Sequence, residues 1–120
     1  MAMKKILIVD DEPELLELLK GRLKGRYEII TAPDAEKGFE RAVGEAPDLI
    51  LSDLMMPNVD GFQLLDRLKQ HFSTRHIPFV IISAFGESRQ IMKAQEMGAT
   101  DFLIKPLHLE ELPDIVRRYA

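Results

Sequence analysis

The chain has 120 residues, 46% of them hydrophobic and 30% charged, with a formal net charge of −4. This length and composition fit one globular domain, and the apolar runs are far shorter than the ~20 residues that a membrane-spanning helix needs. The absence of cysteine excludes disulfides and thiolate chemistry, and the lack of a signal-peptide pattern favours the cytoplasm. The acidic balance and scattered basic residues argue against direct binding to nucleic acid or membrane.

Short apolar runs alternate with helix-like stretches along the chain. That alternation is typical of βα units around a parallel sheet, and continuous apolar runs suit strands that are covered on both faces. The sequence predicts strands at about 6–9, 27–32, 49–51, 79–82 and 102–104. The sequence therefore predicts an α/β fold.

Helices are predicted between and after these strands, at about 13–24, 35–46, 61–70, 88–97 and 113–119. In the first, Pro13 suits the start, Gly25 suits the C-terminal cap, and leucines form one apolar stripe. In the second, Asp34 is the expected N-cap. The second helix is expected to turn its apolar side chains inward, namely Phe39, Ala42 and Val43. The last helix is expected to be short and to begin near Pro113, because proline removes a helix hydrogen bond from an interior position.

Polar residues stand where four of the apolar runs stop. Asp10 and Asp11 follow the first run, Asp53 the third, Ser83 the fourth and Lys105 the fifth. Ligands of open α/β sheets bind beyond the carboxyl ends of the strands, so these side chains are expected to converge. Crowded carboxylates without His or Cys select a hard cation, Mg²⁺ or Mn²⁺. A carboxylate nucleophile, a metal ion, a lysine and a hydroxyl are what phosphoryl transfer requires.

Each of these residues also has a purely structural interpretation. Asp11 and Glu14 suit a capping box at the start of the first helix. Taken singly, Asp53 suits a turn and Ser83 a hydroxyl in a loop. Lys105 alone suits a solvent-exposed lysine, and Phe102, which lies in the last predicted strand, suits a core aromatic. The functional interpretation is preferred because it accounts for all the positions together.

Four segments resemble the response-regulator receiver domain of two-component signalling, at 6–12, 49–61, 80–84 and 98–106. The resemblance extends over nearly the whole chain. It implies a flavodoxin-like, three-layer (βα)₅ fold: a doubly wound, five-stranded parallel sheet of order 2-1-3-4-5. Residues 1–120 are expected to form a single receiver domain. Because only 14 residues follow Pro106, no effector domain is expected in this chain, which is either a stand-alone regulator or a receiver from a longer protein.

The resemblance further implies the roles of individual residues. Asp53 corresponds to the phosphoacceptor, which takes a phosphoryl group from a phosphohistidine. Asp10, Asp11 and Asp53, with the backbone carbonyl of Met55, correspond to the magnesium site. The implied donor is a sensor histidine kinase or a histidine phosphotransfer protein. The domain would catalyse its own phosphorylation and slow dephosphorylation rather than act as an ordinary enzyme.

Other residues correspond to the phosphoryl-binding and switching groups of that family. Lys105 would pair with Asp53 and later with the phosphoryl group, and Ser83 and Ala84 would bind it. Phe102, where many members have tyrosine, would move inward, and the face of helix 4, strand 5 and helix 5 would change. Three further residues correspond to structural positions at the site, Pro57, Gly61 and Pro106, with the Lys105–Pro106 bond expected to be cis.

Two other functions remain open. A phosphoaspartate-forming hydrolase would normally carry a second acid two residues after its nucleophile, but Met55 stands there after Asp53. A receiver-like module that binds partners without accepting phosphate would share the fold. A P-loop nucleotidase is excluded, because no glycine-rich loop is followed by Lys and Ser or Thr.

Overall fold

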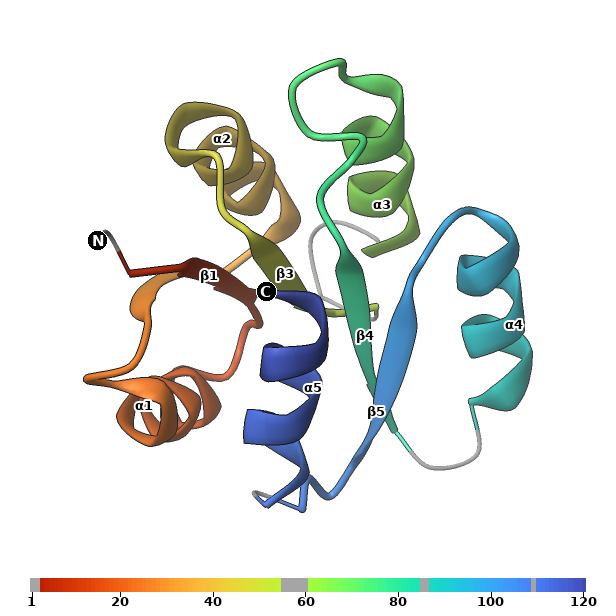
Figure 1. Ribbon diagram of the computed structural model, residues 1–120. Helices are drawn as coiled ribbons and strands as arrows, with labels where there is room; N and C mark the ends of the chain where they lie inside the picture. The colour runs from red at the N-terminus through yellow and green to blue at the C-terminus, as the bar shows by residue number, and fades with distance from the viewer. Residues whose placement is uncertain (1–2, 55–60, 85–86, 109) are drawn as a thin grey trace.

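The computed structural model describes residues 3–54, 61–84, 87–108 and 110–120. In this part of the chain, strands and helices alternate (Figure 1). The strands are β1 (Lys5–Val9), β2 (Glu28–Ala32), β3 (Leu49–Asp53), β4 (Phe79–Ala84) and β5 (Asp101–Lys105). The helices are α1 (Pro13–Leu23), α2 (Ala35–Glu45), α3 (Gly61–Gln70), α4 (Ser88–Glu96) and α5 (Glu111–Tyr119).

The five strands form one parallel sheet in the order β2-β1-β3-β4-β5. β1 lies between β2 and β3, with Ile6 beside Leu49 and Val9 beside Ser52. The order reverses between β1 and β3, so the connections from these two strands leave toward opposite faces. The predicted fold class and strand order are confirmed.

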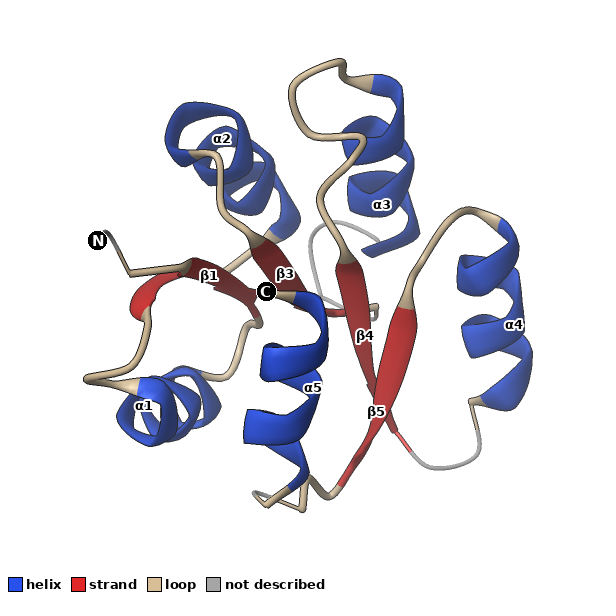
Figure 2. Ribbon diagram, viewed as in Figure 1, coloured by secondary structure: helices blue, strands red, loops and turns tan. Residues whose placement is uncertain are grey.

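Helices cover both faces of the sheet (Figure 2). One apolar cluster packs α2, α3 and α4 against one face, and a second packs α1 and α5 against the other. Successive residues of β1 alternate between the clusters: Leu7 and Val9 face the first, and Ile6 and Ile8 face the second. All four are fully buried. This double burial explains why the strand reads as a continuous apolar run.

The local sequence signals at two helix ends are confirmed. Gly25, just beyond α1, has a φ of 91°, a conformation that a side chain disfavours. The Asp34 carboxylate accepts a hydrogen bond from the Lys37 N–H at 2.8 Å and so caps α2.

Two expectations about the helices are wrong in detail. Val43 is exposed, because α2 presents Ala35, Gly38 and Ala42 to the sheet instead. A Cβ on Gly38 would lie only 2.9 Å from Val9 Cγ2, so small residues set this close packing. The last helix begins at Glu111, two residues before Pro113.

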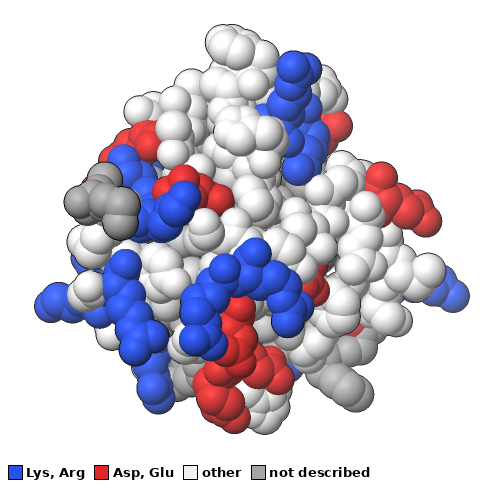
Figure 3. Space-filling view, viewed as in Figure 1, with Lys and Arg blue, Asp and Glu red and all other residues white. Residues whose placement is uncertain are grey.

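Charged side chains are distributed over the viewed face in separate groups, with acidic and basic residues interspersed (Figure 3). Among the described residues, the helices are all too short or too polar to cross a bilayer.

Candidate functional site

The carboxyl ends of β1, β3, β4 and β5 meet at one edge of the sheet, and each supplies a polar side chain. Asp10 directly follows β1 and is fully buried, and its N–H donates to the Ala32 carbonyl at 3.1 Å. Asp53 is the last residue of β3, Ser83 the penultimate residue of β4, and Lys105 the last residue of β5. Asp53 and Ser83 are also buried.

Lys105 connects the acidic residues at this edge. Its Nζ lies 2.9 Å from Asp53 Oδ2, 3.2 Å from Glu12 Oε1 and 3.4 Å from Asp10 Oδ2. The expected ion pair between Lys105 and Asp53 is therefore present. Asp10 Oδ1 also accepts a hydrogen bond from the Glu12 N–H at 2.9 Å, which holds the turn after β1.

The balance of charge at this edge shifts two ionisation equilibria. Burial raises the pKa of Asp10, although the Glu12 N–H and the charge of Lys105 oppose the rise. Burial alone would lower the pKa of Lys105, but its hydrogen bond and ion pair with Asp53 and the charge of Asp10 raise it instead. One ammonium group thus lies among several carboxylates, which repel one another.

The acidic cluster has the composition of a site for a hard cation. Asp10, Asp11, Glu12 and Asp53 each offer a carboxylate oxygen, and these oxygens all lie within 4.8 Å of one another. Asp10 and Asp53 are buried, whereas Asp11 and Glu12 are exposed, so the cluster opens to solvent on one side. Magnesium prefers oxygen ligands and retains several waters, so this donor set fits it.

The structural interpretation of Asp11 is wrong. The N-cap residue of α1 is Glu12 rather than Asp11, and the Glu12 side chain makes no capping hydrogen bond. The alternative of a capping box between Asp11 and Glu14 therefore does not hold, and Asp11 lies with the acidic cluster.

Ser83 and Ala84 donate hydrogen bonds to the side chain of Glu87, which the sequence analysis did not single out. The Ser83 hydroxyl donates a short hydrogen bond to Glu87 Oε2, and the Ala84 N–H donates to the same oxygen at 3.3 Å. Neither Glu87 nor the contact of Glu12 with Lys105 was foreseen. The only available signal was that both acids lie within four residues of a strand end.

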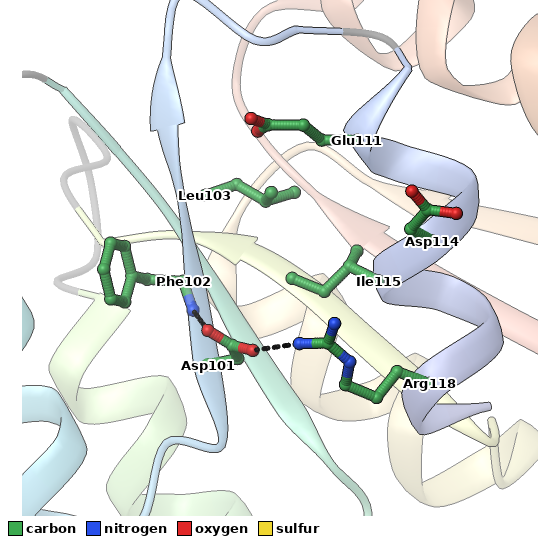
Figure 4. Close-up of a pocket in the computed structure, with 7 residues that line it drawn as sticks. All are labelled: Asp101, Phe102, Leu103, Glu111, Asp114, Ile115 and Arg118. Atoms are coloured by element: carbon green, nitrogen blue, oxygen red, sulfur yellow. Dashed lines mark hydrogen bonds and ion pairs between the residues drawn. The ribbon is translucent and has the colours of Figure 1, made fainter.

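Phe102 is not a core residue, since 39% of its surface is exposed. Figure 4 shows its ring on the opposite side of β5 from Ile115 and Arg118 of α5. There it lines an apolar groove with Ile91 and Met92 of α4. The ring therefore lies on the α4 side of β5.

Gly61 and Pro106 shape the backbone around the site. A Cβ on Gly61 would lie 2.6 Å from the carbonyl oxygen of Asp53, so this close approach requires glycine. The Lys105–Pro106 peptide bond is cis, as expected. Met55 and Pro57 lie outside the described residues.

Residues 6–117 match the response regulator receiver domain family. The chain belongs to this family. It is 39% identical over 116 residues to the "DNA-binding dual master transcriptional regulator RpaA" of Synechocystis, covering 96% of this chain and 48% of that protein. It is 41% identical to the response regulator PleD of Caulobacter vibrioides, covering 86% of this chain and 23% of PleD. This receiver domain thus spans half or less of these two curated relatives.

Solved receiver structures have the same fold. A putative response regulator from Chloroflexus aurantiacus superimposes with a TM-score of 0.91 at 31% identity, covering 98% of this chain and 97% of that one. The Vibrio cholerae chemotaxis protein CheY4 superimposes with a TM-score of 0.92 at 27% identity, covering 99% and 100% of the two chains. The receiver family is a phosphoacceptor switch rather than a family of ordinary enzymes.

Proposed function

We propose that this receiver domain accepts a phosphoryl group on Asp53. A carboxylate oxygen of Asp53 attacks the phosphorus, the bond from phosphorus to the donor breaks, and the donor leaves with the bonding electron pair. For a phosphohistidine donor, the leaving atom is an imidazole nitrogen. The observation that supports this assignment best is the Lys105 ammonium, which lies 2.9 Å from Asp53 Oδ2 beside the acidic cluster.

The residues proposed to hold Mg²⁺ or Mn²⁺ are Asp10, Asp11 and Asp53, with the backbone carbonyl of Met55. When bound, the ion would supply positive charge to offset the negative phosphoryl oxygens. The oxygen-only donor set supports this assignment, because the clustered carboxylates carry an excess of negative charge that a cation relieves.

Three groups are proposed to bind the phosphoryl oxygens after transfer. Lys105 would exchange part of its contact with Asp53 for a contact with the new dianion. The Ser83 hydroxyl and the Ala84 N–H would donate hydrogen bonds to it. Phe102 would then rotate inward, and the α4-β5-α5 face would carry the signal. Gly61, Pro57 and Pro106 would keep the surrounding backbone in place.

The proposed phosphoryl donor is a sensor histidine kinase or a histidine phosphotransfer protein. The domain itself would catalyse the transfer and, slowly, the hydrolysis of the aspartyl phosphate, in which water attacks the phosphorus, the Asp53 carboxylate leaves and inorganic phosphate is released. We propose no direct binding to nucleic acid or membrane by this single domain and place the reaction in the cytoplasm, as the sequence analysis predicts.

Intact-mass measurement after incubation with acetyl phosphate tests this function. The wild-type protein should gain one phosphoryl group when magnesium is present and none when a chelator is added first. The Asp53→Asn variant should gain none. A folded wild-type protein that never gains the group would contradict the proposal and favour a module that only binds partners. A gain that survives in the variant would show that another residue is the acceptor.

A further inference from the structure

The Glu87 side chain connects the end of β4 to the start of α4. Its Oε2 atom accepts hydrogen bonds from the Ser83 hydroxyl and the Ala84 N–H. The Glu87 N–H also donates to the Ala84 carbonyl at 3.3 Å, and its carbonyl accepts from the Ile91 N–H at 3.0 Å. Glu87 therefore contacts Ser83 through its side chain and the first turn of α4 through its backbone, so a change at one contact would affect the other.

Glu87 stands at the N-cap position of α4 but does not cap the helix. Its side chain makes no capping hydrogen bond and turns back toward β4 instead. A helix N-terminus normally attracts an acidic side chain, because its first N–H groups lack partners. The orientation of Glu87 shows that the two donors of β4 bind its carboxylate in preference to those of α4.

The same two donors are those that the proposed function assigns to the phosphoryl group. A serine hydroxyl has one hydrogen to donate, so Ser83 cannot donate to Glu87 and to a phosphoryl oxygen at once. Ser83 is buried, so water does not readily replace a lost partner. Two anions would thus compete for one pair of donors.

We propose that Glu87 is an internal competitor of the phosphoryl group and the positioning residue for Ser83. In the unphosphorylated domain, its carboxylate holds Ser83 and Ala84 and fixes the start of α4. Phosphorylation of Asp53 would displace the carboxylate, and the freed Glu87 would release the first turn of α4. This inference rests on the proposed function, since it requires that a phosphoryl group reaches Ser83.

The affinity for beryllofluoride, a phosphoryl mimic that binds an aspartate carboxylate, measures this competition. The titration is done in magnesium buffer and followed by the NMR amide signals of Ala84 and Ile91. Removing the competing charge by Glu87→Gln should tighten binding about tenfold, because the mimic then displaces a neutral amide oxygen rather than a carboxylate from the Ser83 and Ala84 donors. A purely structural role for Glu87 predicts weaker or unchanged binding instead.

Two further variants isolate the hydrogen bond from the charge. Glu96→Gln removes the same charge from an exposed residue at the other end of α4 and should leave the affinity within about twofold of wild type. In a Ser83→Ala background, Glu87→Gln should give a much smaller gain, because the main shared donor is gone. A gain of equal size in both backgrounds would overturn the inference in favour of simple charge repulsion.

The outcomes separate this inference from the function on which it rests. Tight binding by the wild type, no binding by Asp53→Asn and no gain in Glu87→Gln would overturn the competition alone. Absence of binding by the wild type would overturn the assignment of Asp53 and the competition with it.

Discussion

The two ends of the parallel sheet differ in their balance of positive and negative side chains. At the amino end, Lys5 lies 3.9 Å from Glu45, and the Lys5 N–H donates to Asp48 at 2.8 Å. At the carboxyl end, the single ammonium group of Lys105 forms ion pairs with three acidic side chains. The amino end is nearly balanced by its own residues, whereas the carboxyl end is short of positive charge. We therefore expect the charges at the amino end to support folding, and the excess of negative charge at the carboxyl end to cost folding free energy when no cation is bound.

Substituting the lysine at each end tests this difference most strongly. Lys105 and Lys5 have side chains of equal exposure, 24% and 25%, so they form a matched pair. Lys105→Ala leaves buried carboxylates without their cation and should lower the free energy of unfolding by about 2–3 kcal/mol. Lys5→Ala should cost about 1 kcal/mol or less.

Urea denaturation at pH 7 in the absence of divalent ions measures both losses. Added magnesium should reduce the stability deficit of Lys105→Ala relative to the wild type and leave that of Lys5→Ala unchanged, because the wild type and Lys5→Ala bind the ion through the same intact site. Equal losses in the two variants would contradict the difference in charge balance.

Asp10→Asn should stabilise the protein, by about 1–2 kcal/mol at pH 7 without divalent ions. Burial raises the pKa of Asp10 in the folded state above its ordinary value of 3.8, so ionising this carboxyl costs folding free energy. That cost is absent below pH 3.8, appears as the pH rises toward the folded pKa, and is complete above it. The advantage of Asp10→Asn should therefore disappear on acidification.

Asp48→Asn is the control at the amino end, where the carboxylate is 40% exposed rather than buried. Because Asp48 accepts the Lys5 N–H, this substitution should be neutral or slightly destabilising at pH 7. A loss of stability in Asp10→Asn would show that the carboxyl end carries no excess of negative charge.

The smallest effect is expected at the amino end of β5. The Tyr119 hydroxyl donates to Asp101 Oδ2 at 2.6 Å, and Arg118 lies 3.7 Å from the same oxygen. Tyr119→Phe should cost at most about 1 kcal/mol, because Arg118 still pairs with Asp101. The hydrogen bond to Asp101 also raises the pKa of Tyr119, so its stabilising contribution is lost as the pH rises through that pKa. Ultraviolet titration of the wild type should show a phenol with a raised pKa that is missing in Tyr119→Phe. If that phenol is still seen in Tyr119→Phe, the raised pKa does not belong to Tyr119.

The strand pattern made most of this architecture predictable. Continuous apolar runs such as that of β1 identify buried parallel strands, and the carboxyl ends of such strands meet at one edge. The convergence of Asp10, Asp53 and Lys105 follows from these two facts, because it depends on backbone geometry alone.

Features that depend on side-chain conformation were not predictable. Glu87 is three residues beyond Ala84, and only the hydrogen bond in the folded structure shows that its carboxylate turns back toward β4. The packing of α2 depends on Gly38, whose missing side chain gives no apolar signal. Pro113 lies in the first turn of α5, where an N–H has no helical partner in any case, so the helix begins before it.

The most direct test of the central claim is to identify the phosphorylated residue chemically. Borohydride reduces an aspartyl phosphate to homoserine, releasing phosphate, and peptide mass spectrometry then locates the altered residue. After treatment with acetyl phosphate and magnesium, we expect homoserine at position 53 and at no other aspartate. Homoserine at Asp10 or Asp11, or unmodified Asp53 in a protein that has gained the phosphoryl mass, would contradict the account.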